Sequence, residues 1–326
     1  MSSESAPLPG TTHHPSPIAH HATRLRVVLL VNPTAGMRPV PVEQVRAALL
    51  ARGADVEVVT TTTSGEGTAI ARRAAEADAD ALLVCGGDGT INDAVNGLAG
   101  SRTALAVVPA GTVNVWAREV GIPADPLRAA ALLWEGERRR IDLGRAGERY
   151  FLLMAGIGFD ADVAARVTRP EKRRWGALAY LGRGIGIALR WPLQRMWLLL
   201  DDRPLRRRAL FAVVGNTRLY GGVVNITHHA VADDGMLDVC LFGGQGRAEK
   251  VAHFIRVATR SHTKAPTVEY YRVHQLTLVT RPRVPVQVDG DTIGQTPMTF
   301  AAVPRALTVI VPRGRSDGLF LRPPEP

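Results

Sequence analysis

Short apolar runs alternate with amphipathic stretches between residues 25 and 142, and this pattern predicts strands and helices in turn. The expected strands are Arg26–Val31, Asp55–Thr60, Ala81–Cys85 and Leu105–Val108, and the expected helices are Val42–Arg52, Thr68–Ala77 and a segment that ends at Leu98. Repeated strand–loop–helix units with short apolar strands are typical of a parallel sheet covered by helices on both faces. We therefore expect an α/β domain in residues 25–145.

The pattern changes after residue 145, where short strand-like runs are separated by Gly, Pro and Asp. These runs are Tyr150–Ala155, Trp197–Leu200, Ala209–Val214, Met236–Phe242, Gln275–Thr280, Val284–Val288 and Ala306–Val311, with helices expected only at Arg173–Arg190 and Arg247–Thr259. Such spacing indicates a mainly antiparallel β domain in residues 146–312, with a cleft between the two domains. Residues 1–24, rich in Ser, Pro, Thr and His, are expected to form a disordered tail, and residues 313–326 a C-terminal tail.

Charge and composition exclude several classes of protein. The 326 residues carry 40 Lys and Arg against 30 Asp and Glu, a net charge of +10 that points to an anionic partner. Only three of the basic residues are lysines, and the chain contains neither a Gly-Lys-Ser/Thr loop nor the His-Arg-Asp loop of protein kinases. Aromatic residues make up only 5%, which is sparse for a protein that stacks single-stranded bases.

Three glycine-bearing loops each follow an expected strand of the first domain: Asn32–Gly36, Gly86–Thr90 and Pro109–Asn114. In a parallel sheet, such loops emerge together at the carboxyl ends of the strands, where α/β proteins bind ligands. Glycines allow backbone N–H groups to approach an anion closely, and a helix that starts near Thr90 would point its positive end at the same place. The structural alternative is a Thr90-x-x-Asp93 capping box with glycines that serve turn geometry alone. We favour phosphate binding.

Five motifs together resemble the diacylglycerol kinase catalytic-domain family, which includes bacterial soluble lipid kinases and the sphingosine and ceramide kinases. The motifs are Gly86-Gly87-Asp88-Gly89-Thr90 with Asn92-Asp93, Pro109-x-Gly111-Thr112-x-Asn114, Asn32-Pro33-x-x-Gly36, Asp233-Asp234-Gly235-x-Leu237 and Asp289-Gly290-Asp291. The first motif alone is shared with NAD kinases, whereas the set is more specific to lipid kinases. The resemblance covers about residues 25–312 and implies a three-layer α/β nucleotide-binding domain, a β-sandwich lipid-binding domain, and ATP with magnesium.

The resemblance also implies roles for individual residues. The residues expected to border or wrap the ATP phosphates are Asn32, Pro33, Thr34, Ala35, Gly36, Thr61, Gly86, Gly87, Asp88, Gly89, Thr90, Ile91, Asn92 and Thr112. A magnesium ion is expected on Asp234 and the backbone carbonyls of Val231 and Met236, linked through that ion to Asp142 and Asp88. An oxygen-only site suits magnesium.

The catalytic residues expected from the resemblance are Asp88, Asp289 and Asp291. Either Asp289 or Asp291 could receive the proton of the lipid hydroxyl, and we slightly favour Asp289. Two positions depart from the family pattern: Val115 stands where many members carry Asp or Asn, and Asp291 stands where the pattern has Glu. The first removes a polar contact of the loop, and the second shortens the side chain by one methylene.

A strongly basic segment, residues 166–208, holds twelve basic and three acidic residues and includes three tryptophans. Such a segment is typical of a peripheral enzyme at an anionic membrane surface. The alternative is a solvated arginine-rich face. Nucleic acid is not expected as a partner because no nucleic-acid motif accompanies the charge. The longest stretch without a charged side chain, Thr103–Ala117, is too short to span a membrane, and two cysteines offer no disulfide framework, so we expect a cytoplasmic protein.

Taken together, these features predict a magnesium-dependent, membrane-associating lipid kinase of phospholipid metabolism. The hydroxyl acceptor would be diacylglycerol or a sphingoid base. An NAD kinase-like enzyme and a catalytically inactive lipid- or nucleotide-binding module are the alternatives. The sequence leaves open whether the chain acts as a monomer or as a homodimer.

Overall fold

The computed structural model of the chain describes residues 24–36, 40–63, 65–158, 191–222, 224–244, 246–259, 261–314 and 318–325. The expected helix Arg173–Arg190 and nearly all of the expected N-terminal tail lie outside these residues. Within them, no helix combines the length and the apolar character that crossing a membrane requires.

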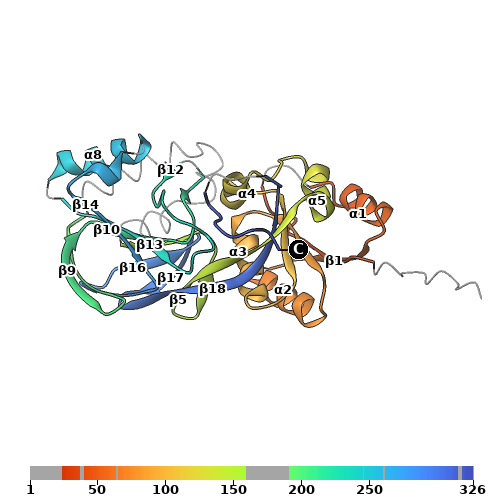
Figure 1. Cartoon of the computed structure of the whole chain (residues 1–326), viewed down its shortest axis with the longest axis horizontal. Helices are drawn as coiled ribbons and strands as arrows, with labels where there is room; N and C mark the ends of the chain where they lie inside the picture. The colour runs from red at the N-terminus through yellow and green to blue at the C-terminus, as the bar shows by residue number, and fades with distance from the viewer. Residues whose placement is uncertain are drawn as a thin grey trace, which may run out of the picture.

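Four parallel strands form the sheet of the first half, in the order β2-β1-β3-β4. The strands are β1 (Arg26–Val31), β2 (Asp55–Thr60), β3 (Ala81–Gly86) and β4 (Ala104–Pro109), and the helices are α1 (Val42–Ala51), α2 (Glu66–Glu76), α3 (Asp88–Leu98), α4 (Val115–Val120) and α5 (Pro126–Glu135). Right-handed connections place α1 and α5 together on one face and α2 and α3 on the other (Figure 1). This covering explains why β3 is buried along its whole length.

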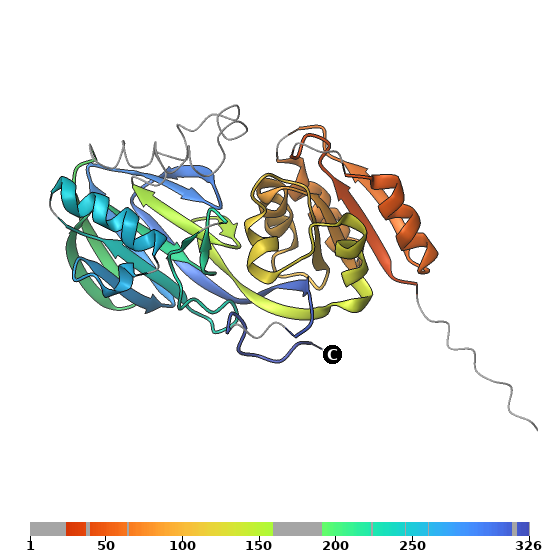
Figure 2. The ribbon, with the colours of Figure 1, turned by 90° about the horizontal axis from the view of Figure 1, so that it is seen from above.

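Two long strands carry this sheet into the second half. β18 (Met298–Val311) runs parallel to β4 at Val309 and antiparallel to β5 (Glu137–Ala146), which also pairs with β6 (Arg149–Phe151). Beyond β18 the sheet continues through β15 (Gln275–Arg281), β8 (Gln194–Leu200) and β9 (Arg203–Ala209). A single ten-stranded sheet therefore links the two halves, and Figure 2 shows β5 and β18 running between them.

A second, antiparallel sheet of six strands packs against β8, β15 and β18. Its order is β14 (Val268–Val273), β13 (Leu237–Phe242), β10 (Phe211–Gly215), β7 (Met154–Gly158), β16 (Pro285–Val288) and β17 (Asp291–Gln295). Buried residues from both sheets, such as Ile157, Leu198, Leu278 and Phe300, form the core between them. The remaining elements are the hairpin β11 (Leu219–Tyr220) and β12 (Val224–Asn225), helix α8 (Arg247–Ala258) and the short 3-10 helix His262–Lys264. The predicted α/β half followed by an antiparallel β sandwich is confirmed.

Some elements differ from those expected. The run Tyr150–Ala155 is not one strand but β6 and β7, separated by Leu152 and Leu153, because the amides of these two residues bind a side chain instead of a neighbouring strand. Ala306–Val311 is only the end of β18, and it completes the sheet of the first half. The pattern did not predict β9 and β17, which are polar because each is the last strand of its sheet and faces solvent along one edge.

Candidate active site

The three predicted loops meet at the carboxyl ends of β1, β3 and β4, and their glycines make this contact possible. A Cβ atom on Gly36 would lie 1.8 Å from the carbonyl oxygen of Ala110, and one on Gly111 would lie 2.7 Å from the Cα atom of Gly87. Any side chain at these glycines would therefore push the loops apart. The loops form one backbone-lined surface at the sheet edge where α/β proteins bind ligands.

Asparagine side chains hold the loops in shape. Asn32 donates from Nδ2 to the Thr90 hydroxyl at 2.9 Å, and its Oδ1 accepts from the amide of Thr34 at 3.0 Å. Asn114, in the left-handed region at φ +52°, both donates to and accepts from the backbone of Gly111 at 2.7 Å. These side chains are engaged with the loops themselves, so the groups that would meet a phosphate are backbone amides.

The alternative of a capping box at Thr90 and Asp93 is wrong. Helix α3 begins at Asp88 with Gly87 as its N-cap residue, and no side chain caps it. Thr90 binds Asn32, and Asp93 lies 3.3 Å from Arg149. The positive end of α3 therefore points into the glycine-lined surface, as an anion site requires.

The predicted nucleotide-binding residues differ in their exposure. Those exposed on the loop surface are Pro33, Thr34, Gly36, Gly89 and Thr112, and those half-buried are Asn32, Ala35, Gly87 and Asp88. The buried ones are Thr61, Gly86, Thr90, Ile91 and Asn92. The Thr61 hydroxyl lies 3.4 Å from the carbonyl oxygen of Val31, in the layer behind the loops.

Asp88 bridges two of the loops. Its Oδ1 atom accepts a hydrogen bond of 2.7 Å from the amide of Val115, the first residue of α4. Burial raises the pKa of Asp88, while backbone amides of α4 and the charge of Arg118 oppose that rise. A valine at position 115 was expected to remove a polar contact of the loop. The backbone amide of Val115 makes a polar contact with Asp88 instead, and the Val115 side chain is buried. The carboxylate lies at the edge of the loop surface, beside the positive end of α4.

Helix α3 runs from the loops to the second half of the chain. Asn96 donates to the carbonyl oxygen of Tyr150 at 3.0 Å and accepts from the Tyr150 amide at 2.9 Å, so it pairs with β6 as a neighbouring strand would. One turn earlier on the same face, Asn92 donates from Nδ2 to Asp289 at 2.7 Å. The helix therefore connects the expected phosphate site directly to the expected catalytic carboxylate.

The carboxylate of Asp289 accepts four hydrogen bonds. Besides Asn92, the donors are the amides of Leu152, Leu153 and Met154, at 2.7, 3.0 and 2.9 Å. An ionised carboxylate has about four lone-pair positions, so Asp289 can accept a proton only if one of these donors moves away. Asp289 thereby holds the break between β6 and β7 against α3, and it fixes the junction of the two halves.

Burial raises the pKa of Asp289 to about 6, against the hydrogen bonds that favour its charged form. A carboxylate with a pKa near the working pH is suited to accept a proton, because it is ionised at neutral pH and still basic. Its four donors also make it a positioning group. The geometry therefore allows Asp289 to act as a proton acceptor and as a positioning group, and measurements on its variants distinguish the two roles.

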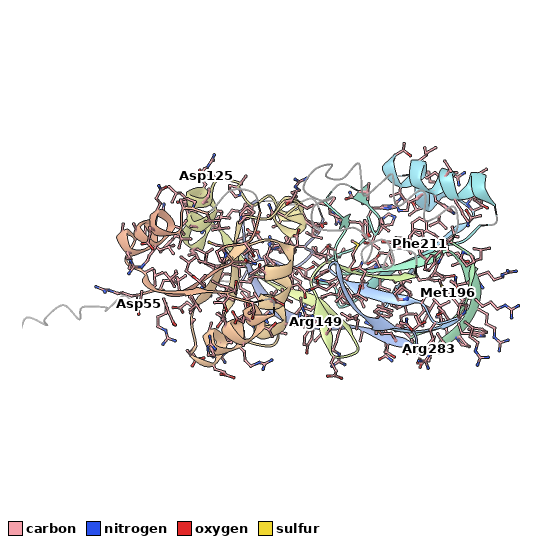
Figure 3. The ribbon with its side chains drawn as sticks, turned by 180° about the vertical axis from the view of Figure 1, so that it is seen from behind. Asp55, Asp125, Arg149, Met196, Phe211 and Arg283 are labelled. Atoms are coloured by element: carbon pink, nitrogen blue, oxygen red, sulfur yellow. The ribbon has the colours of Figure 1, made fainter. Side chains whose placement is uncertain are left out.

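Arg149 gathers the polar side chains of this junction. Its Nη2 atom donates to Oδ1 of Asn92 at 2.8 Å and lies 3.3 Å from Asp93 and 3.8 Å from Asp291. Because a guanidinium only donates, it turns the Asn92 oxygen toward itself and the Asn92 nitrogen toward Asp289. Figure 3 shows Arg149 where the two halves meet. The side chain of Asp291 is more exposed, at 55%.

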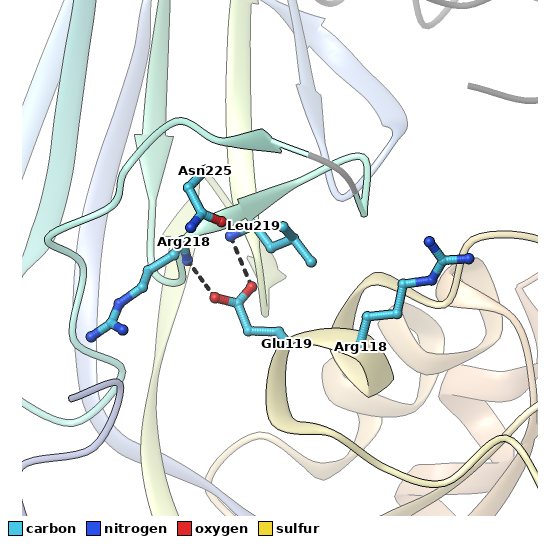
Figure 4. A pocket seen from close by; sticks show the side chains of 5 residues that line it. All are labelled: Arg118, Glu119, Arg218, Leu219 and Asn225. Carbon is cyan, nitrogen blue, oxygen red and sulfur yellow. Dashed lines mark hydrogen bonds between the residues drawn. The ribbon is translucent and has the colours of Figure 1, made fainter. Parts of the chain in front are cut away.

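A second tie between the halves lies beside α4 (Figure 4). Glu119 accepts hydrogen bonds from the amides of Arg218 and of Leu219, the first residue of β11, at 3.0 and 2.8 Å, and burial raises its pKa. These residues line a cavity of about 190 Å³ together with Arg118 and Asn225. Helix α4 is thus held by Asp88 at its start and by β11 at its end, so the loop it follows is coupled to the second half.

Two of the carboxylates predicted at the magnesium site, Asp142 and Asp234, lie near each other. Fully buried Asp142 accepts from the amides of Arg305 and Gly235, and burial together with the nearby charge of Asp234 raises its pKa. Asp234 accepts from the amide of Met236 at 2.9 Å and also contacts the Arg272 guanidinium. Two neighbouring carboxylates fit a hard cation in donor type, and Arg272 already supplies positive charge there.

Among the described residues, no direct contact joins Asp88 to these carboxylates. Across the described segments, no group of three or more His, Cys, Asp or Glu side chains is placed to hold a metal ion. The described partners of Asp88 are Asn114 and residues of α4, including Arg118, whereas Asp142 accepts from the amides of Arg305 and Gly235. The link from Asp88 through an ion to the other two therefore stays a prediction.

Sequence reasoning missed Arg149, Asn96 and Glu119. Arg149 and Glu119 look like ordinary surface charges in the sequence, because their partners lie far along the chain. Asn96 did carry a signal: it stands four residues after Asn92, so both project from one face of α3. A polar pair at that spacing on a mostly buried helix indicates a docking face.

Two family models match consecutive parts of the chain. The diacylglycerol kinase catalytic domain matches residues 26–146, and the YegS C-terminal NAD kinase beta sandwich-like domain matches residues 154–311. Residues 26–146 belong to the diacylglycerol kinase catalytic-domain family. The first match contains the three loops, and the second contains Asp289 and Asp291.

Relatives in the diacylglycerol kinase family span nearly the whole chain. The diacylglycerol kinase of Staphylococcus carnosus is 28% identical over 297 residues, covering 89% of this chain and 96% of its own. That of Bacillus subtilis is 29% identical over 303 residues, covering 90% and 99%. A crystal structure of a diacylglycerol kinase from Bacillus anthracis, at 23% identity, shares the fold with a TM-score of 0.70 over 89% of this chain and 98% of its own. The chain is thus an enzyme of the kinase class with an alcohol acceptor.

Proposed function

We propose that this enzyme transfers the γ-phosphoryl group of ATP to the hydroxyl group of a lipid. Diacylglycerol is the acceptor that the names of its relatives favour, and a sphingoid base is the alternative. The observation that carries the proposal is helix α3, which starts at the glycine-lined loops and one turn later holds Asp289 through Asn92. A triphosphate on the loops would direct its terminal phosphate along this helix toward the junction of the two halves.

The chain's own groups divide the work of the reaction. Backbone amides of the three loops and the positive end of α3 bind and orient the phosphates. The lipid hydroxyl oxygen forms a bond to the γ-phosphorus, the bond from that phosphorus to the β–γ bridging oxygen breaks, and ADP leaves. The hydroxyl proton passes to a carboxylate at the junction, for which we propose Asp289 with Asp291 as the alternative. Magnesium supplies charge neutralisation on the phosphates when it is bound.

The acceptor is tested by offering ATP with diacylglycerol, sphingosine and NAD in separate assays, the lipids in neutral mixed micelles. We expect phosphorylation of one lipid at a rate well above that of NAD. Phosphorylation of NAD alone would establish the NAD kinase-like alternative. Phosphorylation of none, with ATP still bound, would establish an inactive binding module.

Magnesium at Asp234 is tested by thermal unfolding. If Asp234 and the carbonyls of Val231 and Met236 bind the ion in the folded state, saturating magnesium should raise Tm by mass action. Asp234→Ala should remove that shift. If magnesium leaves the Tm of the wild type unchanged, Arg272 alone neutralises the negative charge of Asp234. If magnesium raises the Tm of the variant by the same amount as that of the wild type, the ion binds elsewhere.

The cellular setting follows from the proposed product. A phosphorylated diacylglycerol is a precursor of phospholipids, so we place the enzyme in phospholipid biosynthesis. We propose that it works from the cytoplasm at the membrane surface, where its substrate resides. Cell fractionation with and without a high-salt wash tests this placement, and recovery only in a salt-resistant membrane fraction would contradict peripheral association.

A further inference from the structure

The outer face of the sandwich at β8, β9 and β15 has an unusual composition. Side chains along β8 alternate, with Met196, Leu198 and Leu200 in the core and Arg195, Trp197 and Leu199 facing outward. We call six outward-facing residues of these three strands the arginine face. They are Arg195, Trp197, Leu199, Arg206, Arg208 and Arg281.

The strand register brings like charges together. Arg195 lies opposite Arg208 on one side and opposite Arg281 on the other, so three arginines form a row across three strands. Trp197 lies opposite Arg206, and the Arg281 guanidinium is 5.9 Å from the Trp197 ring. Like charges directly opposite each other destabilise a sheet. This row therefore opposes folding unless an anion offsets it.

No carboxylate of the described residues offsets the positive charge of this row. Within the described ranges, the four arginines of the arginine face (Arg195, Arg206, Arg208 and Arg281) make no ion pair. Arg207, which lies between Arg206 and Arg208 in β9, differs because it forms an ion pair with Glu269 at 2.6 Å. A cavity of about 360 Å³ opens on this part of the sheet, lined by Arg195, Met196, Trp197, Arg206, Arg207 and Arg208. That volume falls at the lower end of small-ligand sites, roughly 300–1,000 Å³.

We propose that the arginine face adsorbs to the headgroups of anionic phospholipids. Guanidinium groups bind phosphate oxygens in a bidentate manner, and a tryptophan among them is suited to the headgroup layer. Leu199, 42% exposed, adds an apolar contact that a solvated basic face does not need. The choice of a lipid partner rests on the proposed function. The surface is formed by a sheet and includes Arg281, far along the chain from the basic segment 166–208.

Another role for these arginines is protection of the sheet edge. β9 is the last strand of the ten-stranded sheet, and charged side chains prevent such edges from pairing with another chain. That role requires charge near β9 only. It does not require Arg281 on β15 or the outward-facing, half-buried Trp197 on β8, so lipid binding and edge protection make different predictions.

The test is cosedimentation of the full chain with phosphatidylcholine vesicles, with and without phosphatidylglycerol, at low and high salt and without ATP. The face variant is Arg195→Gln, Arg206→Gln, Arg208→Gln and Arg281→Gln combined. The matched control changes four exposed arginines of the first half, Arg72→Gln, Arg73→Gln, Arg102→Gln and Arg128→Gln. We expect salt-sensitive binding to anionic vesicles that falls by about tenfold or more in the face variant and little in the control.

Equal losses in both variants would overturn the proposal, because net charge alone would then explain binding. Unchanged lipid binding with a new tendency to aggregate would overturn it in favour of edge protection. Preferential binding of a short RNA over anionic vesicles would overturn it in favour of nucleic acid. If the wild type shows the expected binding but phosphorylates no lipid in neutral micelles, the surface stands and the proposed function fails.

Discussion

Replacing Asp289 by asparagine should lower kcat for lipid phosphorylation by about a hundredfold or more, the typical effect of losing a general base. The asparagine NH2 group would replace one carboxylate oxygen and meet two of the four donors that now bind Asp289. Unfolding in urea should therefore also show a lower stability, by about 1–3 kcal/mol for each donor left unpaired. Steady-state kinetics and urea unfolding of the same preparation measure both effects.

Asp291→Asn is the matched control, because Asp291 is the more exposed carboxylate of the same turn. We expect this variant to lose less activity than Asp289→Asn and to keep its stability. A far larger loss in Asp291→Asn would reverse the assignment of the base. An activity loss in Asp289→Asn that matches its unfolded fraction would leave Asp289 only a structural role.

The pH dependence separates the two roles of Asp289. Because burial raises its pKa to about 6, the carboxylate is ionised above that pH and protonated below it. As a base it must be ionised, so kcat/KM should fall as the pH drops through about 6. This acidic limb should persist in Asp291→Asn, and its displacement there would identify Asp291 as the titrating base.

Replacing Asp88 by asparagine should nearly abolish turnover while leaving thermal unfolding close to that of the wild type. Asp88 places a negative charge beside the loops expected to bind phosphate. This charge would repel a bound phosphate unless a cation lies between them or the carboxylate takes part in proton transfer. An asparagine oxygen can still accept from the Val115 amide, so the start of α4 should be kept. Kinetics and thermal unfolding of the variant measure this difference.

Asp88→Ala provides the comparison, because it removes both the charge and the acceptor. We expect it to lose activity as Asp88→Asn does, and in addition to lose about 1 kcal/mol of stability through the missing contact to α4. Wild-type activity in Asp88→Asn would remove Asp88 from the site.

The first half of the fold was predictable because its sheet is parallel and covered on both faces. Continuous apolar runs such as Ala81–Cys85 mark strands of this kind, and glycine loops after them mark the ligand edge. The polar strands were not predictable from periodicity. β5 begins with Glu137 and three arginines, and it becomes a strand because β18 pairs with it along its length. Tertiary pairing decides such segments.

The candidate site was predictable as a set of motifs but not as a geometry. The motifs named Asn92 and Asp289 without indicating that the two are hydrogen-bonded across the two halves. They also placed Asn92 at the phosphates, whereas it is 1% exposed and lies at the junction. Arg149, which orients Asn92, is an isolated basic residue in the sequence. Only the packing of α3 on β6 shows that these residues act together.

The central claim is that the loops and the Asp289 junction form one site for lipid phosphorylation. Its most direct test incubates the enzyme with diacylglycerol micelles and ATP labelled at either the γ- or the α-phosphate, followed by counting of the chloroform-soluble product. We predict that γ-label enters the lipid, that α-label does not, and that Asp289→Asn transfers about a hundredfold less. The claim would be contradicted by the absence of chloroform-soluble γ-label from diacylglycerol and sphingosine alike, with an enzyme that binds ATP.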